Sequence, residues 1–335
     1  MKEEEIRPQR VFDEYLRLAQ LDAVRFFADA PRLAGLCPAC ASPGELAFTK
    51  NGFAYELCPE CFTLFVNPRP VADAFSRYYT DSPSAKFWAS TFYKETAEAR
   101  RQKLWKPKAQ LIHQALLRYQ AAGHSVIDVG GGFGLFAEEM RMLSGSPIVV
   151  IEPGPDLAKI CREKSLLVVE KFLEQVAIGD LPSGSKAFVS FELFEHLHSP
   201  GAFLSRLKEL MSPGDLFIFT TLSSAGVDIQ ALWEDSKSVS PPHHLNFLNP
   251  TSAAILLERK GFELLEVTTP GKLDIDILSN SRVDIKDRFW RTFIATANAA
   301  VMERWQTLLA ETGFSSHMMV ICRKPERSHA LSGAL

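Results

Sequence analysis

Seven short apolar runs, separated by amphipathic stretches, constrain the fold of this chain more than any other feature of its sequence. They follow Gly123 and read SVIDVG, PIVVIE, SLLVVE, AFVSFE, DLFIFTT, FELLEVTT and HMMVICR. Runs of this length and composition are typical of strands buried on both faces. The helical stretches between them favour parallel neighbours. We therefore predict an α/β fold with a seven-stranded, mostly parallel, doubly wound sheet.

A glycine-rich turn follows the first of these runs. It reads Asp128-Val-Gly130-Gly-Gly132-Phe-Gly134 and leads into an amphipathic helix. Glycine lets the backbone turn sharply and lets a ligand approach without a Cβ in the way. Glu152 ends the second run, where a carboxylate can accept hydrogen bonds from both hydroxyls of a ribose. The turn is therefore expected to bind a cofactor.

Two cofactors compete for this turn. The segment from Gly132 to Ala137 fits GxGxxA, with Glu152 about twenty residues further on, as in nicotinamide-dependent dehydrogenases. Asp128, however, stands two residues before the first glycine, and the pattern is then DxGxGxG. This pattern resembles motif I of class I S-adenosylmethionine-dependent methyltransferases, in which the acid helps to place the amino acid part of the cofactor. The dehydrogenase is kept as an alternative.

The resemblance to the methyltransferases continues from Gly123 to Lys324. Ser190 to Leu197 is similar to the family's segment after strand four, and Pro213 to Thr221 to its "PGGxLxxxTP" strand five. His243 to Pro250 is similar to its "EHxNFF" segment. The resemblance implies a Rossmann-like methyltransferase sheet, S-adenosylmethionine as the cofactor and an enzyme rather than a non-catalytic binding protein.

The chain departs from the family pattern at two positions. Many members have an acid after strand three that meets the adenine amino group, whereas Phe172 stands at the nearest position here, so adenine could be held by stacking and backbone contacts. Lys186-Ala187 replaces the usual Phe-Asp before strand four. Neither change removes the methionine or ribose contacts. The expected cofactor-binding residues are Asp128, Gly130, Gly132, Phe133, Gly134, Glu152, Phe172 and Phe191.

Four of the six cysteines form two CxxC pairs, Cys37/Cys40 and Cys58/Cys61, with a hairpin signal at Asn51-Gly52 between them. This is the spacing of a zinc ribbon with a tetrahedral ion. Four thiolates fill the coordination shell, so the zinc should be structural. A redox dithiol and chance spacing are the alternatives. Cys161 and Cys322 are expected in the core.

Proton transfer from an acceptor hydroxyl would need a base near the donor, and histidine suits this role at neutral pH. His196 follows the fourth run, and His243 and His244 follow the fifth. Such loops lie at the carboxyl ends of strands, where open α/β sheets bind ligands. His196 and His244 are the candidates for proton transfer, and His243 is assigned a surface or supporting role.

Glu192, Glu195 and His196 could instead hold a divalent ion. Their i, i+3, i+4 spacing can place three side chains on one side of a helical turn. This ExxEH is similar to one in ubiquinone-pathway O-methyltransferases and small-RNA 2′-O-methyltransferases, which implies Mg²⁺ or Mn²⁺, with His244 as the nearest counterpart of a further histidine ligand. The candidate catalytic residues are thus His196, His244, Glu195 and Glu192, with purely structural roles as the alternative.

The whole chain is predicted to divide into five parts. Residues 1–33 form an N-terminal helical segment with apolar positions Val11, Tyr15, Leu18 and Leu21, and residues 34–70 the ribbon. Residues 71–122 read as an aromatic-rich helical cap, 123–325 as the methyltransferase domain and 326–335 as a flexible tail. An insertion at about 270–315 could shape an acceptor pocket or a homodimer contact.

Composition limits the partners. The formal net charge of −3 gives no field that attracts phosphate backbones, so a zinc-ribbon RNA methyltransferase is the disfavoured rival. The acidic start and the absence of a long apolar run predict a cytoplasmic protein without a membrane span.

The combination of a ribbon with this domain resembles bacterial methyltransferases of sugar, polysaccharide and antibiotic-sugar pathways. The resemblance implies a role in carbohydrate biosynthesis. It also implies a sugar, nucleotide-sugar or natural-product acceptor, methylated on oxygen or carbon. Arg100 and Arg101 could meet a diphosphate, although arginines on a charged helix are more often solvated.

Overall fold

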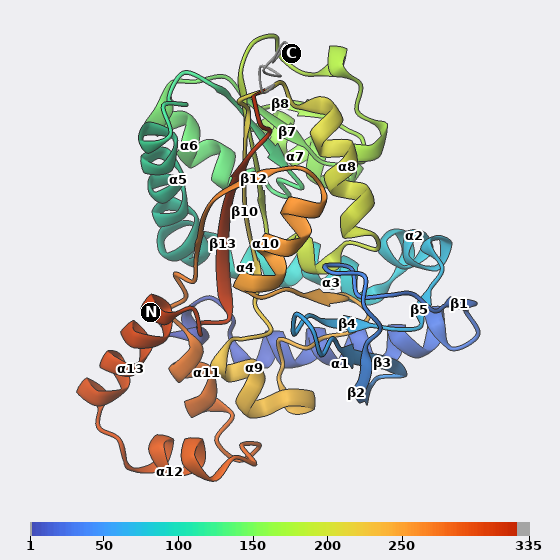
Figure 1. The fold of residues 1–335 in the computed structure, drawn as a ribbon, viewed down its shortest axis with the longest axis vertical. Helices are drawn as coiled ribbons and strands as arrows, with labels where there is room; N and C mark the ends of the chain where they lie inside the picture. Colours follow the sequence, from blue (N-terminus) through green and yellow to red (C-terminus); the bar gives the residue numbers. More distant parts are fainter. Residues whose placement is uncertain (1, 327–335) are drawn as a thin grey trace, which may run out of the picture.

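The central element of the computed structural model, which describes residues 2–326, is a seven-stranded sheet (Figure 1). Its strand order is β12-β13-β10-β9-β6-β7-β8, and only β13 runs antiparallel to its neighbours. This confirms the predicted mostly parallel sheet and all seven runs. The strands are β6 (Ser125–Val129), β7 (Ile148–Ile151), β8 (Leu167–Val169), β9 (Lys186–Phe191), β10 (Leu216–Leu222), β12 (Glu263–Thr268) and β13 (His317–Arg323).

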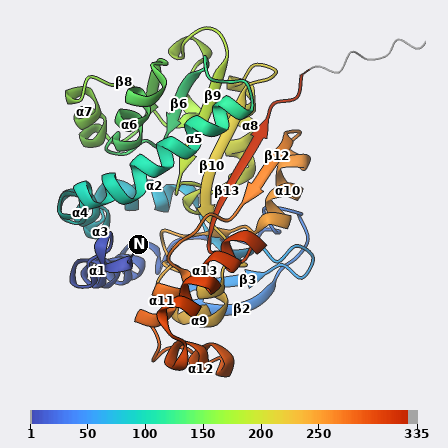
Figure 2. The ribbon, with the colours of Figure 1, turned by 90° about the vertical axis from the view of Figure 1, so that its left-hand side faces the viewer.

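Helices cover both faces of this sheet (Figure 2). On one face, α5 (Lys106–Arg118), α6 (Leu135–Ser144) and α7 (Pro155–Glu163) pack on side chains such as Val126 and Val150. On the other, α8 (Pro200–Leu210) and α10 (Pro250–Arg259) pack on side chains such as Ile127 and Val149. Successive strand residues point to opposite faces, so the sheet can be apolar throughout.

The N-terminal third is helical around the ribbon. Helix α1 (Gln9–Phe27) buries Val11 and Tyr15, but Leu21 is 55% exposed, so the predicted apolar face ends before it. A nearly continuous helical segment then runs from Pro83 into α5. It comprises α3 (Pro83–Phe87), a π-helical turn (Trp88–Phe92), α4 (Tyr93–Arg100), a second π-helical turn (Arg101–Trp105) and α5, and it is preceded by α2 (Ala72–Asp81). Because α5 packs on the sheet, the cap has no clear boundary at residue 122.

The ribbon hairpin forms as predicted, and its sheet continues into a strand from the catalytic part of the chain. Strands β2 (Glu45–Lys50) and β3 (Phe53–Leu57) meet at Asn51-Gly52, both with positive φ. Strand β4 (Leu64–Val66) continues the sheet, and its other edge pairs with β11 (Asn246–Phe247) from the catalytic part. A two-residue pair, β1 (Arg32–Leu33) with β5 (Arg69–Pro70), lies beside it. The ribbon and the catalytic domain therefore share a sheet.

The insertion at about 270–315 is helical. It comprises α11 (Asp274–Asn280), α12 (Arg288–Thr296) and α13 (Ala299–Thr312), which share an apolar cluster with α9 (Val227–Leu232). Within residues 2–326, none of the helices has the length and apolarity that a membrane crossing requires. The predicted flexible tail at 326–335 lies almost wholly outside the described residues.

Two buried aspartates meet where α9 packs on α11. Asp274 is fully partnered: it accepts hydrogen bonds from the Gln306 side chain, the Ser315 hydroxyl and the Ser316 backbone. Asp228 is wholly buried and neither of its carboxylate oxygens has a hydrogen-bond partner in the described chain. Burial, together with the Asp274 charge, raises the pKa of Asp228 to about 7, and the nearby Ser316 side chain and Ile229 backbone, which do not reach hydrogen-bond geometry, offset part of the shift. The fold therefore holds Asp228 largely protonated up to near-neutral pH.

We expect Asp228→Asn to stabilise the protein above neutral pH. The unfolded carboxyl ionises near pH 4 and the folded one near 7, so wild-type stability falls as pH rises between these values. An amide does not ionise, so the variant should avoid a loss on the order of 2–4 kcal/mol. Urea unfolding at pH 5 and pH 8 measures this.

Asp215→Asn is the matched control, because the buried Asp215 carboxylate accepts hydrogen bonds from the backbone of Lys186 and Ser212. This variant should be destabilised at both pH values, since it puts an amide NH₂ where an acceptor is needed. An Asp228→Asn protein less stable than wild type at pH 8 would contradict the assignment.

Candidate active site and cysteine cluster

The glycine turn lies at the carboxyl end of β6 and opens onto space that a ligand can enter. Gly130, Gly132 and Gly134 all have positive φ, which residues with a Cβ rarely adopt. A Cβ at Gly131 would come within 2.7 Å of an Asp128 carboxylate oxygen, whereas a Cβ at Gly132 would meet nothing within 4 Å. The turn is thus crowded at Gly131 by the Asp128 side chain, whereas the space next to Gly132 is open.

Asp128 is the buried acid behind this turn. It is 1% exposed, and its Oδ2 atom has no hydrogen-bond partner in the described chain. Burial and the nearby Glu152 raise its pKa to about 7, and Lys108 offsets part of the shift. A buried acceptor without a partner is costly unless a donor arrives. Asp128 therefore fits a ligand that brings an ammonium group.

Glu152 shapes the turn from the end of β7. Its two carboxylate oxygens accept hydrogen bonds of 2.9 Å from the backbone N–H groups of Gly132 and Gly154. Burial raises its pKa, and these two hydrogen bonds lower it. The carboxylate thus faces the open glycine, where a ribose hydroxyl could also be accepted.

Aromatic side chains surround the turn, but not all those predicted. Tyr93 of α4 stacks on Phe133, with ring centroids 3.4 Å apart. Phe191 is buried against Phe136 at 4.5 Å. Phe172, which was predicted to stack on adenine, is 56% exposed. Tyr93 was assigned from the sequence only to the helical cap, and its contact with the glycine turn was not predicted.

A second polar group lies at the carboxyl ends of β9 and β10. Glu195 and His196 occupy a 3-10 turn (Phe194–His196) after β9, and His244 lies just before β11. Their ligand atoms all lie within 4.8 Å of one another. The backbone N–H of Leu245 donates to the Glu195 carbonyl at 2.7 Å, which ties the two segments together. The structure thus brings together three of the four predicted catalytic residues.

Backbone carbonyls orient both imidazoles. The Nδ1 atom of His196 lies 3.1 Å from the His243 carbonyl, and that of His244 lies 2.5 Å from the Ser238 carbonyl. A carbonyl only accepts, so each Nδ1 carries the proton and each Nε2 keeps a free lone pair. Burial lowers the pKa of His196 to about 4 and of His244 to about 3. Both rings are therefore neutral at physiological pH and can accept a proton or bind a metal.

The Glu195 carboxylate lies beside these imidazoles. Glu195 is 1% exposed and accepts a hydrogen bond of 2.9 Å from the Thr221 hydroxyl. Burial, reinforced by the charge of Glu192, raises its pKa to about 8. With this pKa the carboxyl is largely protonated at neutral pH, so it stabilises a positive charge on either ring only when it has given up its own proton.

Glu192 does not join this group, contrary to the expected helical grouping. Its backbone has φ of +51°, and the 3-10 turn begins only at Phe194, so the i, i+3, i+4 geometry is not formed. Its carboxylate instead lies 2.6 Å from the Thr220 hydroxyl and 3.2 Å from the Lys108 ammonium. The charges of His317 and Lys108 hold its pKa low against the effect of burial. The structure groups Glu195 and His196 with His244, the predicted further ligand, and Glu192 lies outside this group.

His243 has a supporting position and is not at the surface. It is 6% exposed, its Nε2 atom contacts the Tyr78 hydroxyl, and its ring lies 5.3 Å from that of Tyr15. Its carbonyl accepts from His196. The surface alternative is therefore wrong.

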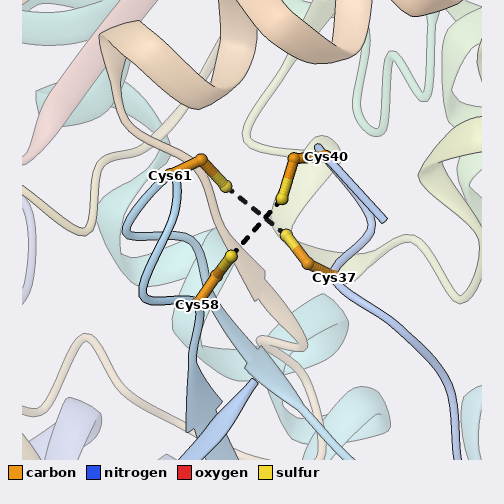
Figure 3. A group of neighbouring side chains, drawn as sticks. All are labelled: Cys37, Cys40, Cys58 and Cys61. Carbon is orange, nitrogen blue, oxygen red and sulfur yellow. Dashed lines mark hydrogen bonds between the residues drawn. The ribbon is translucent and has the colours of Figure 1, made fainter. Parts of the chain in front are cut away.

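The four paired cysteines converge on one point (Figure 3). The Sγ atoms of Cys37 and Cys61 lie 3.5 Å apart, and those of Cys40 and Cys58 lie 3.4 Å apart. Each pair closes an equivalent turn, in which the residue after the second cysteine donates its N–H to the carbonyl of the first. Four free thiols at this spacing fit a tetrahedral divalent ion. Cys161 and Cys322 lie in the core, as predicted.

The cysteine cluster is not an independent core. Cys37, Cys58 and Cys61 belong to the same buried cluster as strand residues such as Ile127 and Phe217. The ribbon and the domain that carries the glycine turn therefore share one core. The reason is physical: so small a segment cannot bury enough apolar surface alone and packs on its neighbour.

Comparison with known proteins decides the family. Residues 97–267, just over half of the chain, match the family described as "Methyltransferase domain". The chain belongs to this methyltransferase family. It is an S-adenosylmethionine-dependent methyltransferase of class I, and the dehydrogenase alternative is set aside.

The methyltransferase is similar to curated enzymes named "Ubiquinone biosynthesis O-methyltransferase". The one from Xanthomonas euvesicatoria pv. vesicatoria (strain 85-10) is 26% identical over 162 residues, covering 45% of this chain and 67% of the relative. The one from Rhodopseudomonas palustris (strain BisA53) is 31% identical over 105 residues, covering 30% of this chain and 41% of the relative. Among solved structures, the plantazolicin methyltransferase BpumL in complex with SAH is similar at TM-score 0.47 and 11% identity, covering 75% of this chain and 94% of that chain.

We expect this methyltransferase to bind S-adenosylhomocysteine more tightly as pH rises through 7. We expect the cofactor's ammonium group to pair with ionised Asp128, whose pKa of about 7 leaves it half protonated at neutral pH. Below that pKa the affinity should change about tenfold per pH unit. Isothermal titration from pH 6 to pH 8 measures it.

Asp128→Asn should lose this pH dependence and bind about ten- to a hundredfold more weakly at pH 8. Asp156→Asn, at the first turn of α7, is the control that keeps the wild-type profile. The same pH profile in Asp128→Asn as in wild type would show that another group titrates.

Proposed function

We propose that this methyltransferase transfers a methyl group to a hydroxyl of a small molecule, with the His196/His244 pair taking the proton. The observation that carries this proposal is the pair of imidazoles with free Nε2 lone pairs beside the buried Glu195. They lie at the carboxyl ends of β9 and β10, at the same edge of the sheet as the glycine turn after β6.

Different residues at this edge of the sheet bind the cofactor and accept the proton. The cofactor supplies the methyl group as an activated sulfonium. Asp128, the glycine turn and Glu152 hold its amino acid part and ribose. The hydroxyl of the acceptor becomes more acidic as the new bond forms, and a neutral imidazole accepts its proton. The second ring and ionised Glu195 then stabilise the resulting imidazolium. Alignment of donor and acceptor supplies the rest of the rate enhancement.

A divalent ion is the second candidate mechanism. Glu195, His196 and His244 offer a carboxylate and two free imidazole nitrogens within 4.8 Å of one another, a ligand set that Mn²⁺ and related ions accept. Such an ion would lower the pKa of a bound hydroxyl directly. In that mechanism the two rings would hold the ion, and the proton of the bound hydroxyl would pass to water.

For the acceptor we propose a sugar, a nucleotide sugar or a related natural product. The ribbon joined to the catalytic domain supports the sugar class, and the names of the curated relatives support methylation on oxygen rather than carbon. The net charge of −3 disfavours RNA. We also propose structural zinc on the four cysteines, and the cytoplasm as location, because free thiolates need a reducing compartment. The homodimer stays a prediction.

Mass spectrometry of reaction products tests the acceptor class. The purified protein is incubated with S-adenosylmethionine and three sets of acceptors: nucleotide sugars, phenolic natural products and short RNAs. Methylation of a hydroxyl in the first or second set is the expected result. Methylation of RNA alone would overturn the small-molecule assignment, and a methyl group found only on carbon or nitrogen would overturn the hydroxyl assignment.

A further inference from the structure

Two arginines share one aromatic cluster next to the histidine pair. The cluster consists of Phe12 and Tyr15 of α1 with Trp88 and Phe92 of the helical cap, and we call it the aromatic wall. The guanidinium of Arg7 lies 5.4 Å from the Phe12 ring, and that of Arg100 lies 5.9 Å from the Trp88 ring.

The aromatic wall extends to the proposed active site through ring contacts. Trp88 lies 4.8 Å from Tyr15, and Tyr15 lies 5.3 Å from His243. The His243 ring lies 6.1 Å from that of His196. Arg100 is also close enough to Tyr93, which stacks on Phe133 of the glycine turn, for its charge to lower the pKa of that tyrosine against the effect of burial. Arg100 thus lies near the cofactor turn, and the aromatic wall that both arginines contact reaches the histidines through His243.

Neither arginine has an anionic partner in the described part of the chain. The Nε atom of Arg100 is buried without a hydrogen-bond partner. Burial first, and then the charge of Arg7, lower the pKa of Arg100 to about 10, so it is still a cation at neutral pH. The adjacent Arg101 differs, because its guanidinium pairs with Glu138 at 2.6 Å and Glu139 at 2.7 Å. Two partly buried cations that repel each other and form no salt bridge are unfavourable, and the charge of Glu192 offsets this only in part for Arg100. A further anion would therefore stabilise the pair.

The segment before α1 holds Arg7 in place. Ile6 is buried, Glu5 pairs with Lys103 after α4, and the Glu3 backbone donates to Asp276 of α11 at 2.7 Å. The start of the chain therefore lies between the helical cap and the α11–α13 insertion (Figure 2). These contacts hold Arg7 next to the aromatic wall, where the residue stays partly exposed.

We propose that Arg7 and Arg100 form a binding site for an anionic group, a carboxylate or a phosphate, on the acceptor molecule. Guanidinium groups bind both anions through two parallel hydrogen bonds. Phe12, Tyr15 and Phe92 are buried, so they position the two arginines and do not themselves contact the bound molecule. This inference rests on the proposed function, because it assigns the acceptor to the side of His196 and His244. It narrows the acceptor to molecules that carry an acid group.

Matched pairs of probes test this site on the whole protein saturated with S-adenosylhomocysteine. One pair is 4-hydroxybenzoate and 4-hydroxybenzamide, and the other is phenyl phosphate and phenol. Isothermal titration should show that the anion of at least one pair binds about ten- to a hundredfold more tightly than its neutral partner. The pair that shows the larger preference distinguishes a carboxylate from a phosphate. No preference in either pair, including no binding of any probe, overturns the proposal.

Charge-removing variants locate the site. Arg7→Gln and Arg100→Gln should each abolish the preference for the anion, whereas Arg100→Lys should keep part of it. Arg10→Gln, at an exposed arginine on the same helix as the wall, is the control that keeps the full preference. Unchanged affinity for S-adenosylhomocysteine shows that each variant is folded. If Arg100→Gln weakens that affinity instead, Arg100 serves the cofactor carboxylate and the proposal is overturned.

The binding experiment on the two arginines can fail or succeed independently of the test of the proposed function. The probes measure binding and need no methyl transfer. A protein that methylates a hydroxyl but shows no preference for anions contradicts this inference alone. A protein that prefers anions but does not depend on His196 or His244 contradicts only the proposed role of the histidines.

Discussion

Replacing His244 by alanine lowers turnover by about 10²–10⁴ while affinity for S-adenosylhomocysteine barely changes. A general base typically raises the rate by a factor of this size. Its Nδ1–H donates to the Ser238 carbonyl, so its free Nε2 faces Glu195 and His196. The ring does not contact the glycine turn in the described structure, so cofactor binding should be unaffected. Steady-state kinetics on the identified acceptor, with titration of S-adenosylhomocysteine, measures both quantities.

His124→Ala is the control, since His124 precedes β6 and lies outside the group of Glu195, His196 and His244. This variant should keep its turnover. Near-normal rates in both His244→Ala and His196→Ala would show that neither histidine takes part in the chemistry, and alignment alone would then supply the rate.

The same variants distinguish the ion mechanism from the base mechanism. With an ion, a chelator should abolish turnover and Mn²⁺ or Mg²⁺ should restore it, and Glu195→Gln should be as damaging as His244→Ala. Glu192→Gln should act differently from Glu195→Gln, because Glu192 contacts Lys108 and Thr220. Chelator-insensitive turnover favours the base mechanism.

Loss of the proposed zinc should destabilise the whole protein and not the ribbon alone. Structural zinc contributes roughly 10–16 kcal/mol of apparent binding free energy in isolated fingers. Here the cysteines share a buried cluster with the central sheet. We therefore expect Cys58→Ser to lose bound zinc and to lower the melting temperature of the single unfolding transition. Elemental analysis and calorimetry of the reduced protein measure these changes.

Turnover should fall further in Cys58→Ser than affinity for the cofactor. The ribbon strand β4 pairs with β11, the Tyr55 hydroxyl donates to the His244 carbonyl at 2.6 Å, and the Asn249 side chain donates to the Cys61 carbonyl at 2.8 Å. A loosened ribbon therefore displaces His244 before it reaches the glycine turn. Cys322→Ala is the control, because Cys322 lies on β13 in the same buried core but is not one of the four converging cysteines. Absence of zinc from chelator-free, reduced wild-type protein would contradict the assignment.

Features that depend on neighbouring residues were predictable from the sequence. The seven strands follow from apolar runs, because a strand buried on both faces excludes polar residues along its length. The glycine turn follows from positive φ values that residues with a Cβ rarely adopt. The hairpin at Asn51-Gly52 follows from the same local restriction.

Features that depend on distant segments were not predictable in this way. The spacing of Glu192, Glu195 and His196 suggested one helical face, but β9 continues to Phe191 and Glu192 turns away with positive φ. No local signal in the sequence joins β11 to the ribbon or places Arg7 near Arg100. Each of these contacts joins residues that are dozens of positions or more apart.

The sequence by itself thus determined the class of fold, the cofactor turn and the four-cysteine cluster, because short-range sterics and spacing encode them. Tertiary structure alone decided which side chains meet: Glu195 and His196 with His244, and Arg7 with Arg100 beside the aromatic wall. The physical reason is that burial creates these sites. Packing removes water from the imidazoles, carboxylates and guanidiniums together, and so sets their pKa values and leaves some of them without partners.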